Sequence, residues 1–227
     1  MAERKNMKKA LIFILTLTVA ICSFVACDSK KDNSTDMPTE ASIQSPVDYS
    51  DINNLPENYL SVIQGKDSFT LMGEEININD YNIHSIGLPL LSFDSALYGV
   101  VDMDGDGNIE VLLSDAKGGD ILVLHLENEA VYGYSFDFRS MYHVMADGSF
   151  HWTASAGRKY GASRLSFIDE NYCQITELYR VEHDYEDAES YKLFIADSEV
   201  TEEEYDEYIK STSSEEITWY KLNVETN

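Results

Sequence analysis

The fold of this chain is decided by the stretch Ala96-Leu-Tyr-Gly-Val-Val-Asp-Met-Asp-Gly-Asp-Gly-Asn-Ile-Glu-Val-Leu-Leu113. Two runs rich in aliphatic residues, 96–101 and 109–113, flank a loop of aspartates and glycines. Short apolar runs that are bounded by such turn residues are typical of β-strands. The stretch therefore predicts two strands of one sheet that are joined by an acidic loop.

Further strands recur at short intervals after this unit. The dipeptide Asp147-Gly148 tolerates positive φ and predicts a hairpin between strands at 142–145 and 149–153. Alternating or apolar runs of the same kind predict strands at 121–126, 131–136, 164–168, 172–181 and 217–222. Together these patterns predict the α+β class: a mostly antiparallel β-meander sheet with a few short helices.

Few helices are expected. The segment 55–63 predicts a short helix, 68–72 a strand, and 75–86 gives no firm prediction. The clearest helix signal is the capping box Thr201-Glu-Glu-Glu204, in which the first and last side chains satisfy each other's backbone N–H groups. Tyr205, Tyr208 and Ile209 then fall on one helix face, which we expect to pack on the sheet.

The acidic loop has the chemistry of a metal site. Calcium binds six to eight oxygen ligands, and carboxylates at alternating positions converge when the chain curls. Asp102, Asp104 and Asp106 provide such carboxylates. Asn108 would offer its backbone carbonyl, and Glu110 its side chain. The sequence therefore predicts a structural Ca²⁺ site, and the alternative is an acidic hairpin that holds no ion.

The spacing of these residues resembles two calcium-binding families. In the EF-hand loop the twelfth position is a glutamate, but here it is Leu113, and the flanks are strand-like. The closer resemblance is to the nine-residue loops of integrin-type repeats, which take ligands from positions 1, 3, 5, 7 and 9 between two strands. That resemblance covers this one segment and implies calcium binding without a biological role.

The N-terminus predicts export. Lys8 and Lys9 precede an apolar run at 10–26, as in a secretory signal peptide, and a polar stretch follows Cys27. The final Phe-Val-Ala-Cys27 resembles the lipobox of bacterial lipoproteins, which implies lipidation of Cys27 and a location on the extracytoplasmic face of the cell membrane. An uncleaved anchor or an ordinary signal peptide is the alternative.

The predicted signal peptide and lipobox divide the chain into three parts. Residues 1–26 are the predicted lipoprotein signal peptide, 27–51 the lipidated cysteine with a flexible linker rich in Ser, Thr, Asp and Asn, and 52–227 a single exported domain. With its lipobox, acidic loop and late capped helix, the exported chain also resembles a group of small gut-bacterial lipoproteins. That group has no assigned activity to carry over.

Charge and residue usage narrow the function further. The net charge of −25 opposes binding to nucleic acid, because phosphate contacts need clustered Lys and Arg. Cys173 lies in a strand-like run and is expected to be an inert thiol. The five histidines lack metal-ligand spacing. A row of aromatic residues at 132, 134, 136 and 138 would form either an exposed binding platform or part of the core, and we favour the core.

These observations favour a binding protein over an enzyme. The sequence holds no nucleophile elbow and no phosphate-binding glycine loop. We therefore expect recognition or scaffolding at the cell envelope, with a glycan or a protein as the ligand and the membrane as a partner through the lipid. The alternative is a secreted hydrolase that acts on glycans or peptides.

Overall fold

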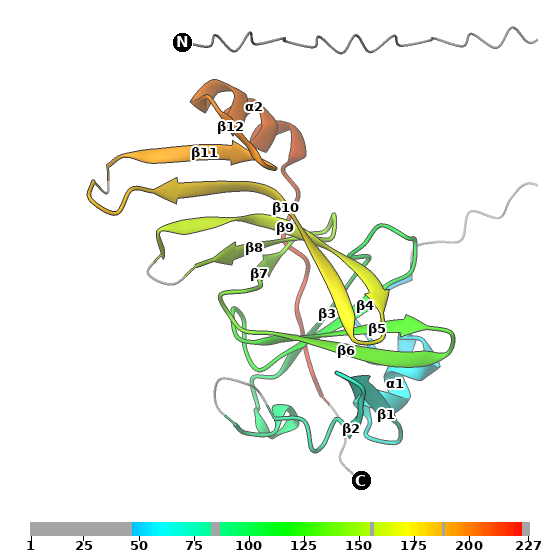
Figure 1. Cartoon of the computed structure of the whole chain (residues 1–227). Coiled ribbons are helices and arrows are strands. Elements are labelled where there is room, and N and C mark those ends of the chain that lie inside the picture. Colours follow the sequence, from blue (N-terminus) through cyan, green and yellow to red (C-terminus); the bar gives the residue numbers. More distant parts are fainter. Residues whose placement is uncertain (1–46, 83–86, 155–156, 188, 224–227) are drawn as a thin grey trace, which may run out of the picture. The chain divides into compact units, whose positions relative to one another are not determined.

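A computed structural model of the chain describes residues 47–82, 87–154, 157–187 and 189–223 (Figure 1). The predicted signal peptide, Cys27 and most of the predicted linker lie outside the described residues. The described residues belong to one compact unit. Within these ranges, no helix combines the length and the apolar character that crossing a membrane requires.

The described residues form an α+β fold that is mostly antiparallel sheet, as the strand pattern predicts. The helices are the 3₁₀ turns η1 Ile52–Asn54 and η2 Leu90–Ser92, and the α-helices α1 Glu57–Ile63 and α2 Glu202–Thr212. The strands are β1 Ser68–Leu71, β2 Glu74–Asn77, β3 Leu97–Val101, β4 Glu110–Ser114, β5 Ile121–Glu127, β6 Ala130–Phe136, β7 Tyr142–Val144, β8 Ser149–Thr153, β9 Lys159–Asp169, β10 Tyr172–His183, β11 Tyr191–Ile195, β12 Ser198–Val200 and β13 Tyr220–Lys221.

The strands divide between two sheets, which the sequence patterns did not distinguish. The first sheet has the order β13-β3-β4-β5-β6-β1-β2, and its centre is the antiparallel meander β3 to β6. The hairpin β1–β2 is added beside β6, with β1 parallel to β6. The second sheet has the order β12-β11-β10-β9-β8-β7, so each strand pairs with its neighbour in the chain.

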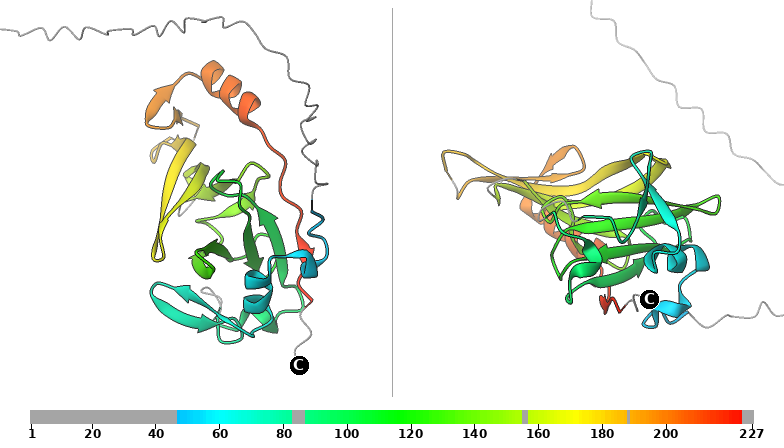
Figure 2. Two further views of the ribbon diagram at one scale, coloured as in Figure 1. Left: turned by 90° about the vertical axis from the view of Figure 1, so that its right-hand side faces the viewer. Right: turned by 90° about the horizontal axis from the view of Figure 1, so that it is seen from below.

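The chain passes between the sheets twice. It leaves the first sheet after β6 and begins the second at β7. After α2 it returns as an extended segment (Figures 1 and 2). In this segment the Ile217 N–H donates to the Val144 carbonyl of the second sheet, whereas β13 pairs with β3 of the first. The strand that we predicted at 217–222 is therefore only Tyr220–Lys221, because its first half bridges the sheets.

Two hydrophobic cores pack against the first sheet. Val111 and Leu113 of β4 point into the first core, which also holds the buried residues of α1. Leu112, between them, points into the second core, to which β8 and β9 of the second sheet contribute Phe150 and Leu165. Every residue of β4 is buried. The centre of the first sheet is thus covered on both faces.

The aromatic row ending at Phe138 belongs mostly to the core. Tyr134 and Phe136 are buried in the second core, and Tyr132 packs against it. Phe138 lies beyond the end of β6 and is 45% exposed. Cys173 also packs against the second core, and burial raises the pKa of its thiol. The first three rings of the row therefore agree with the expected core position, whereas Phe138 does not, and the half-buried Cys173 thiol agrees with the expected inert role.

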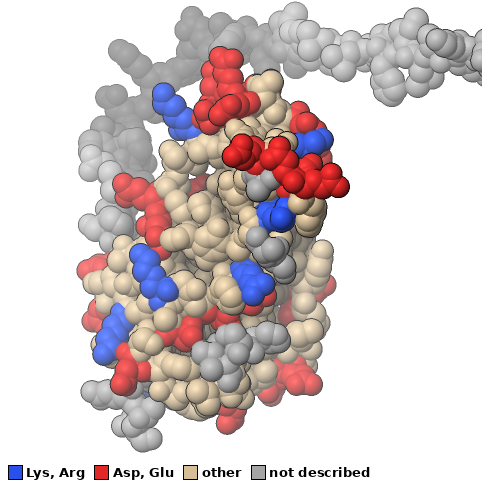
Figure 3. All heavy atoms as spheres, turned by 90° about the vertical axis from the view of Figure 1, so that its left-hand side faces the viewer, with Lys and Arg blue, Asp and Glu red and all other residues tan. Residues whose placement is uncertain are grey.

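The predicted capping box of α2 is confirmed. The Glu204 N–H donates to Thr201 Oγ1, and the Thr201 N–H donates to Glu204 Oε2. Tyr205 and Tyr208 contact the Tyr179 ring of β10 edge-on, with ring centroids 5.7 and 6.3 Å apart. The helix therefore packs on the second sheet through the face that the sequence indicated. Acidic side chains are dense at the α2 end of the face drawn in Figure 3.

A β-bulge at Leu178 changes which side chains of β10 point toward α2. Before the bulge Glu177 pairs with Ser163, and after it Tyr179 pairs with Ala162. Neighbouring residues of a strand point to opposite faces of the sheet. The side chains of Ser163 and Ala162 therefore lie on opposite faces. Glu177 and Tyr179, which would share a face in a regular strand, therefore lie on opposite faces of the second sheet. The bulge directs Tyr179 toward α2.

Gly161 is needed at this bulge, which gives a first prediction. A Cβ at residue 161 would lie 2.1 Å from the Tyr179 carbonyl oxygen, and a backbone atom cannot rotate away. Gly161→Ala should lower the free energy of unfolding by about 3 kcal/mol in urea denaturation. The control Gly118→Ala, with φ +77° and open space around it, should lose only about 1 kcal/mol. Equal losses would contradict the close approach.

Candidate metal centre

The acidic loop connects the last residue of β3 to the first residue of β4. Gly105 and Gly107 have φ of 80° and 91°, a region that residues with a Cβ rarely adopt. These two glycines let the chain curl over only a few residues. The loop is therefore compact, and its carboxylates have little choice of direction.

Asp102 organises the loop from inside. Its Oδ1 accepts a hydrogen bond from the Gly105 N–H at 2.7 Å, and its Oδ2 accepts one from the Gly107 N–H at 3.0 Å. Both donors belong to the glycines at which the backbone turns. The first carboxylate of the predicted ligand set thus holds the curl in place.

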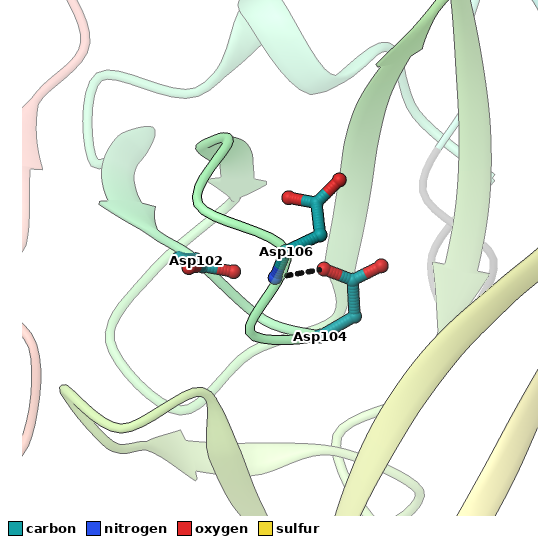
Figure 4. A group of neighbouring side chains, drawn as sticks. All are labelled: Asp102, Asp104 and Asp106. Carbon is teal, nitrogen blue, oxygen red and sulfur yellow. Dashed lines mark hydrogen bonds between the residues drawn. The ribbon is translucent and has the colours of Figure 1, made fainter. Parts of the chain in front are cut away.

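Asp104 and Asp106 continue this pattern (Figure 4). Asp104 Oδ1 accepts the Asp106 N–H at 3.1 Å, and Asp106 Oδ1 accepts the Asn108 N–H at 2.7 Å. The Asn108 side-chain amide also donates to Asp106 Oδ2 at 2.8 Å. Each aspartate therefore accepts a bond from a residue two or three positions later, which brings the three carboxylates toward one side of the curl.

The three aspartates meet closely enough to share a cation. One oxygen from each of Asp102, Asp104 and Asp106 lies within 4.8 Å of the other two. An ionised carboxylate has about four lone-pair sites, so each retains acceptor capacity beside its bonds to the loop. Carboxylate oxygens are the donors that Mg²⁺, Ca²⁺ and Mn²⁺ prefer. The donor set fits a hard divalent cation.

The electrostatics of the loop differ from one aspartate to the next. Burial raises the pKa of Asp104, and the nearby Asp106 and Asp102 carboxylates raise it further against the bond from the Asp106 N–H. The bonds from Asn108 lower the pKa of Asp106, which is exposed. Like charges at this spacing repel one another unless a cation neutralises them. A bound cation would remove this repulsion.

Glu110, the last member of the predicted ligand set, points elsewhere. Its side chain is fully buried, and it is not part of the three-carboxylate group. Its Oε2 accepts the Met103 N–H at 2.7 Å, and its Oε1 lies 3.0 Å from His125 Nδ1. Burial raises the pKa of Glu110, against the effect of the bonds from His125 and Met103. In this geometry Glu110 holds the base of the loop.

His125 was not anticipated from the sequence. Val111 pairs with Leu124 in the β4–β5 ladder, so Glu110 and His125 occupy the next opposed positions. The imidazole also stacks on Phe167 of β9, with centroids 4.0 Å apart and planes at 14°. No local pattern links residues 110 and 125, because their meeting depends on the register of the hairpin. The Glu110–His125 pair could have been predicted only if the register of β4 and β5 had been known.

The hairpin β7–β8 closes over the loop from the second sheet. Gly148, at the predicted Asp-Gly turn, has φ +81°, and a Cβ there would lie 2.4 Å from the Asp102 carbonyl oxygen. Met103, next in the loop, is fully buried in the second core. The acidic loop is therefore held from both sheets while its three aspartates stay at the surface or half-buried.

Comparisons with known proteins transfer no function to this chain. No protein-family model matches the chain, and neither a curated protein nor a solved structure is significantly similar to it. The function must therefore be argued from the residues themselves.

The buried pair gives a second prediction. His125→Phe keeps the stack on Phe167 but removes the partner of a buried carboxylate, which should cost about 3 kcal/mol at pH 7.5 in chelator. Losing this partner raises the pKa of Glu110 further above its unfolded value. Stability linked to a raised pKa is present at low pH and lost as the pH rises, so the deficit should shrink toward pH 5.

The matched control is His143→Phe, because His143 faces Glu216 at 3.3 Å while its side chain is 53% exposed. An exposed pair contributes little, and this variant should lose less than about 1 kcal/mol. Urea denaturation across pH measures both variants. Equal losses in the two variants would contradict the role of burial.

Proposed function

We propose that this chain is a lipid-anchored bacterial surface protein whose exported domain binds a structural Ca²⁺ ion and serves recognition or scaffolding at the cell envelope. The observation that carries the calcium site is the convergence of Asp102, Asp104 and Asp106 within 4.8 Å in the loop between β3 and β4. Asn108 would add its backbone carbonyl, whereas Glu110, the fifth residue that we proposed from the sequence, lies outside the group of three aspartates and bonds to Met103 and His125.

Calcium suits this loop and this location better than other hard cations. Ca²⁺ accepts irregular arrangements of six to eight oxygens, whereas Mg²⁺ demands near-ideal octahedral geometry. Extracellular modules bind calcium with dissociation constants of about 10⁻⁴ M or weaker, which suits an exported domain. The flanking strands are buried or half-buried and are paired over five residues, so we expect the ion to fasten β3 to β4 in a structural role.

The proposed lipid anchor depends on lipidation of Cys27, which lies outside the described residues. A diacylglycerol on this cysteine would place two chains in the bilayer, each methylene contributing about 0.8 kcal/mol. The polar linker at 28–51 would then separate the domain from the membrane surface. The surface location and the calcium site thus support each other, since calcium is abundant outside the cell.

A binding role fits the aromatic pocket between the second sheet and α2 better than hydrolysis does. The pocket is lined by two histidines, but both belong to aromatic contacts: His151 shares a hydrogen bond with the Tyr179 hydroxyl, and His183 lies between the Tyr160 and Tyr191 rings. Its carboxylates, on Glu202 and Asp206, occupy exposed positions of α2. This composition favours recognition.

The calcium proposal is tested by thermal melting of the chain from Ser29 to Asn227. Calcium at 100 times its dissociation constant stabilises the folded state by about 2.7 kcal/mol. For a domain of this size that corresponds to a rise in melting temperature of about 5–10 °C. Asp104→Asn should abolish the rise, and in chelator it should melt no lower than the parent, because one of three crowded charges is gone.

Asp197→Asn is the control, since it removes one aspartate charge from the exposed turn between β11 and β12. It should keep the full calcium-dependent rise. A parent protein whose melting curve is the same with calcium and with chelator would refute the structural metal site.

The anchor is tested separately by Cys27→Ser in the full chain expressed in a bacterial host. The parent should fractionate with membranes and incorporate labelled palmitate, and the variant should incorporate none. Cys173→Ser is the control and should behave as the parent. Palmitate incorporation that persists in Cys27→Ser would exclude lipidation at this residue.

A further inference from the structure

A second candidate site lies between the second sheet and α2, away from the acidic loop. It is a pocket of about 480 Å³, within the range of small-molecule sites. Most of its wall consists of aromatic rings, which come from Tyr142, His151, Tyr160, Tyr179, His183, Tyr191 and Tyr205. Val181, Leu193 and Ile209 provide its aliphatic part.

The strand register explains why these rings meet. Residues that are directly opposite in neighbouring strands share a face of the sheet. Tyr179 pairs with Ala162, which pairs with His151, and two residues further along β10 Val181 pairs with Tyr160. His183 then pairs with Tyr191. One face of four adjacent strands therefore carries the aromatic wall.

The rings contact one another as well as the pocket. His151 Nε2 lies 3.1 Å from the Tyr179 hydroxyl, and the Tyr179 and Tyr205 rings meet edge-on at 5.7 Å. Because the bulge at Leu178 directs Tyr179 to this face, the central ring of the wall depends on it. Such contacts hold the rings in place before any ligand binds. A wall of pre-positioned rings reduces the entropy that binding costs.

The acidic residues that line the pocket all come from α2. Glu202 and Asp206 lie four residues apart on α2, hence on one helix face, and both line the pocket. Its lining residues include no Lys or Arg. Burial and the nearby His143 lower the pKa of His151, which disfavours a positive charge on that imidazole. The net charge of −25 adds an attractive potential for cations.

We propose that this pocket binds a small organic ammonium ion, with the tyrosine rings as an aromatic cage and Glu202 and Asp206 as its counter-charges. Aromatic faces attract cations through the ring quadrupole, and aromatic cages are a recurrent way to bind quaternary ammonium groups. Carboxylates at the edge of the cage would repel an anionic ligand. This inference deepens the proposed binding role but uses none of the residues of the calcium loop.

The test compares choline with 3,3-dimethylbutan-1-ol, which has the same shape with a carbon in place of the charged nitrogen. Titration calorimetry on the chain from Ser29 to Asn227 should detect choline binding, with affinity at least about tenfold higher than for the neutral alcohol. The affinity for choline should fall as salt is raised. Equal binding of both probes would overturn the cation assignment, and so would the absence of choline binding up to 10 mM.

Matched charge variants separate the pocket from the general acidity of the protein. The double variant Glu202→Gln/Asp206→Asn should weaken choline binding at least about fivefold by removing both counter-charges. The control Glu203→Gln/Glu207→Gln removes two charges from the same helix at positions that do not line the pocket. It should bind choline as the parent does. Equal weakening in the two double variants would refute the site.

A ring variant tests the cage itself. Tyr205→Leu keeps an apolar side chain on α2 but removes the ring that meets Tyr179, and it should weaken choline more than the neutral alcohol. Calcium-dependent melting should persist in all of these variants, which shows that they fold. In the parent chain, a lack of choline selectivity with calcium stabilisation intact would refute only the pocket, whereas selective choline binding without calcium stabilisation would refute only the metal site.

Discussion

In the first sheet, β4 lies between two hydrophobic cores, and this double burial constrains the rest of the structure. Alternate side chains of β4 enter opposite cores, so the strand can neither shift by one residue nor rotate without exposing one set. β3 is paired to it over five residues. The acidic loop must therefore connect two fixed strand ends, and its carboxylates are crowded because the chain has only eight residues, 102–109, in which to turn.

The acidic groups of the loop are accommodated in two ways. Glu110 faces inward, where hydrogen bonds with His125 and the Met103 N–H compensate for its burial. These bonds connect the start of β4 to β5 and to the loop at its base. The three aspartates face outward around the curl, where backbone N–H groups satisfy part of their hydrogen-bonding capacity. A hard cation would neutralise what remains. One short segment thus combines a buried carboxyl group, which is hydrogen-bonded within the protein, with an outer group that suits an external ion.

The second sheet shows how a local irregularity produces a surface. Along β10 a regular alternation would place Tyr179 on the same face as Glu177, and the extra residue Leu178 reverses this. Gly161 permits the close approach that the bulge requires. The result is an aromatic wall that α2 completes, with its two carboxylates on one side. This pocket and the acidic loop lie in different parts of the fold, so a structural ion and a ligand would not compete.

The sequence by itself determined the elements whose signals are local. The two strands around the acidic loop, the Asp147-Gly148 hairpin and the capping box at Thr201 are each encoded within a few residues, since backbone preferences and caps act over that range. Only the tertiary structure decided the division into two sheets, the parallel pairing of β1 with β6, the inward turn of Glu110 and the gathering of tyrosines beneath α2. Each of these depends on strand register and on packing between residues far apart in the chain. No short segment carries that information, because register follows from which buried faces fit together.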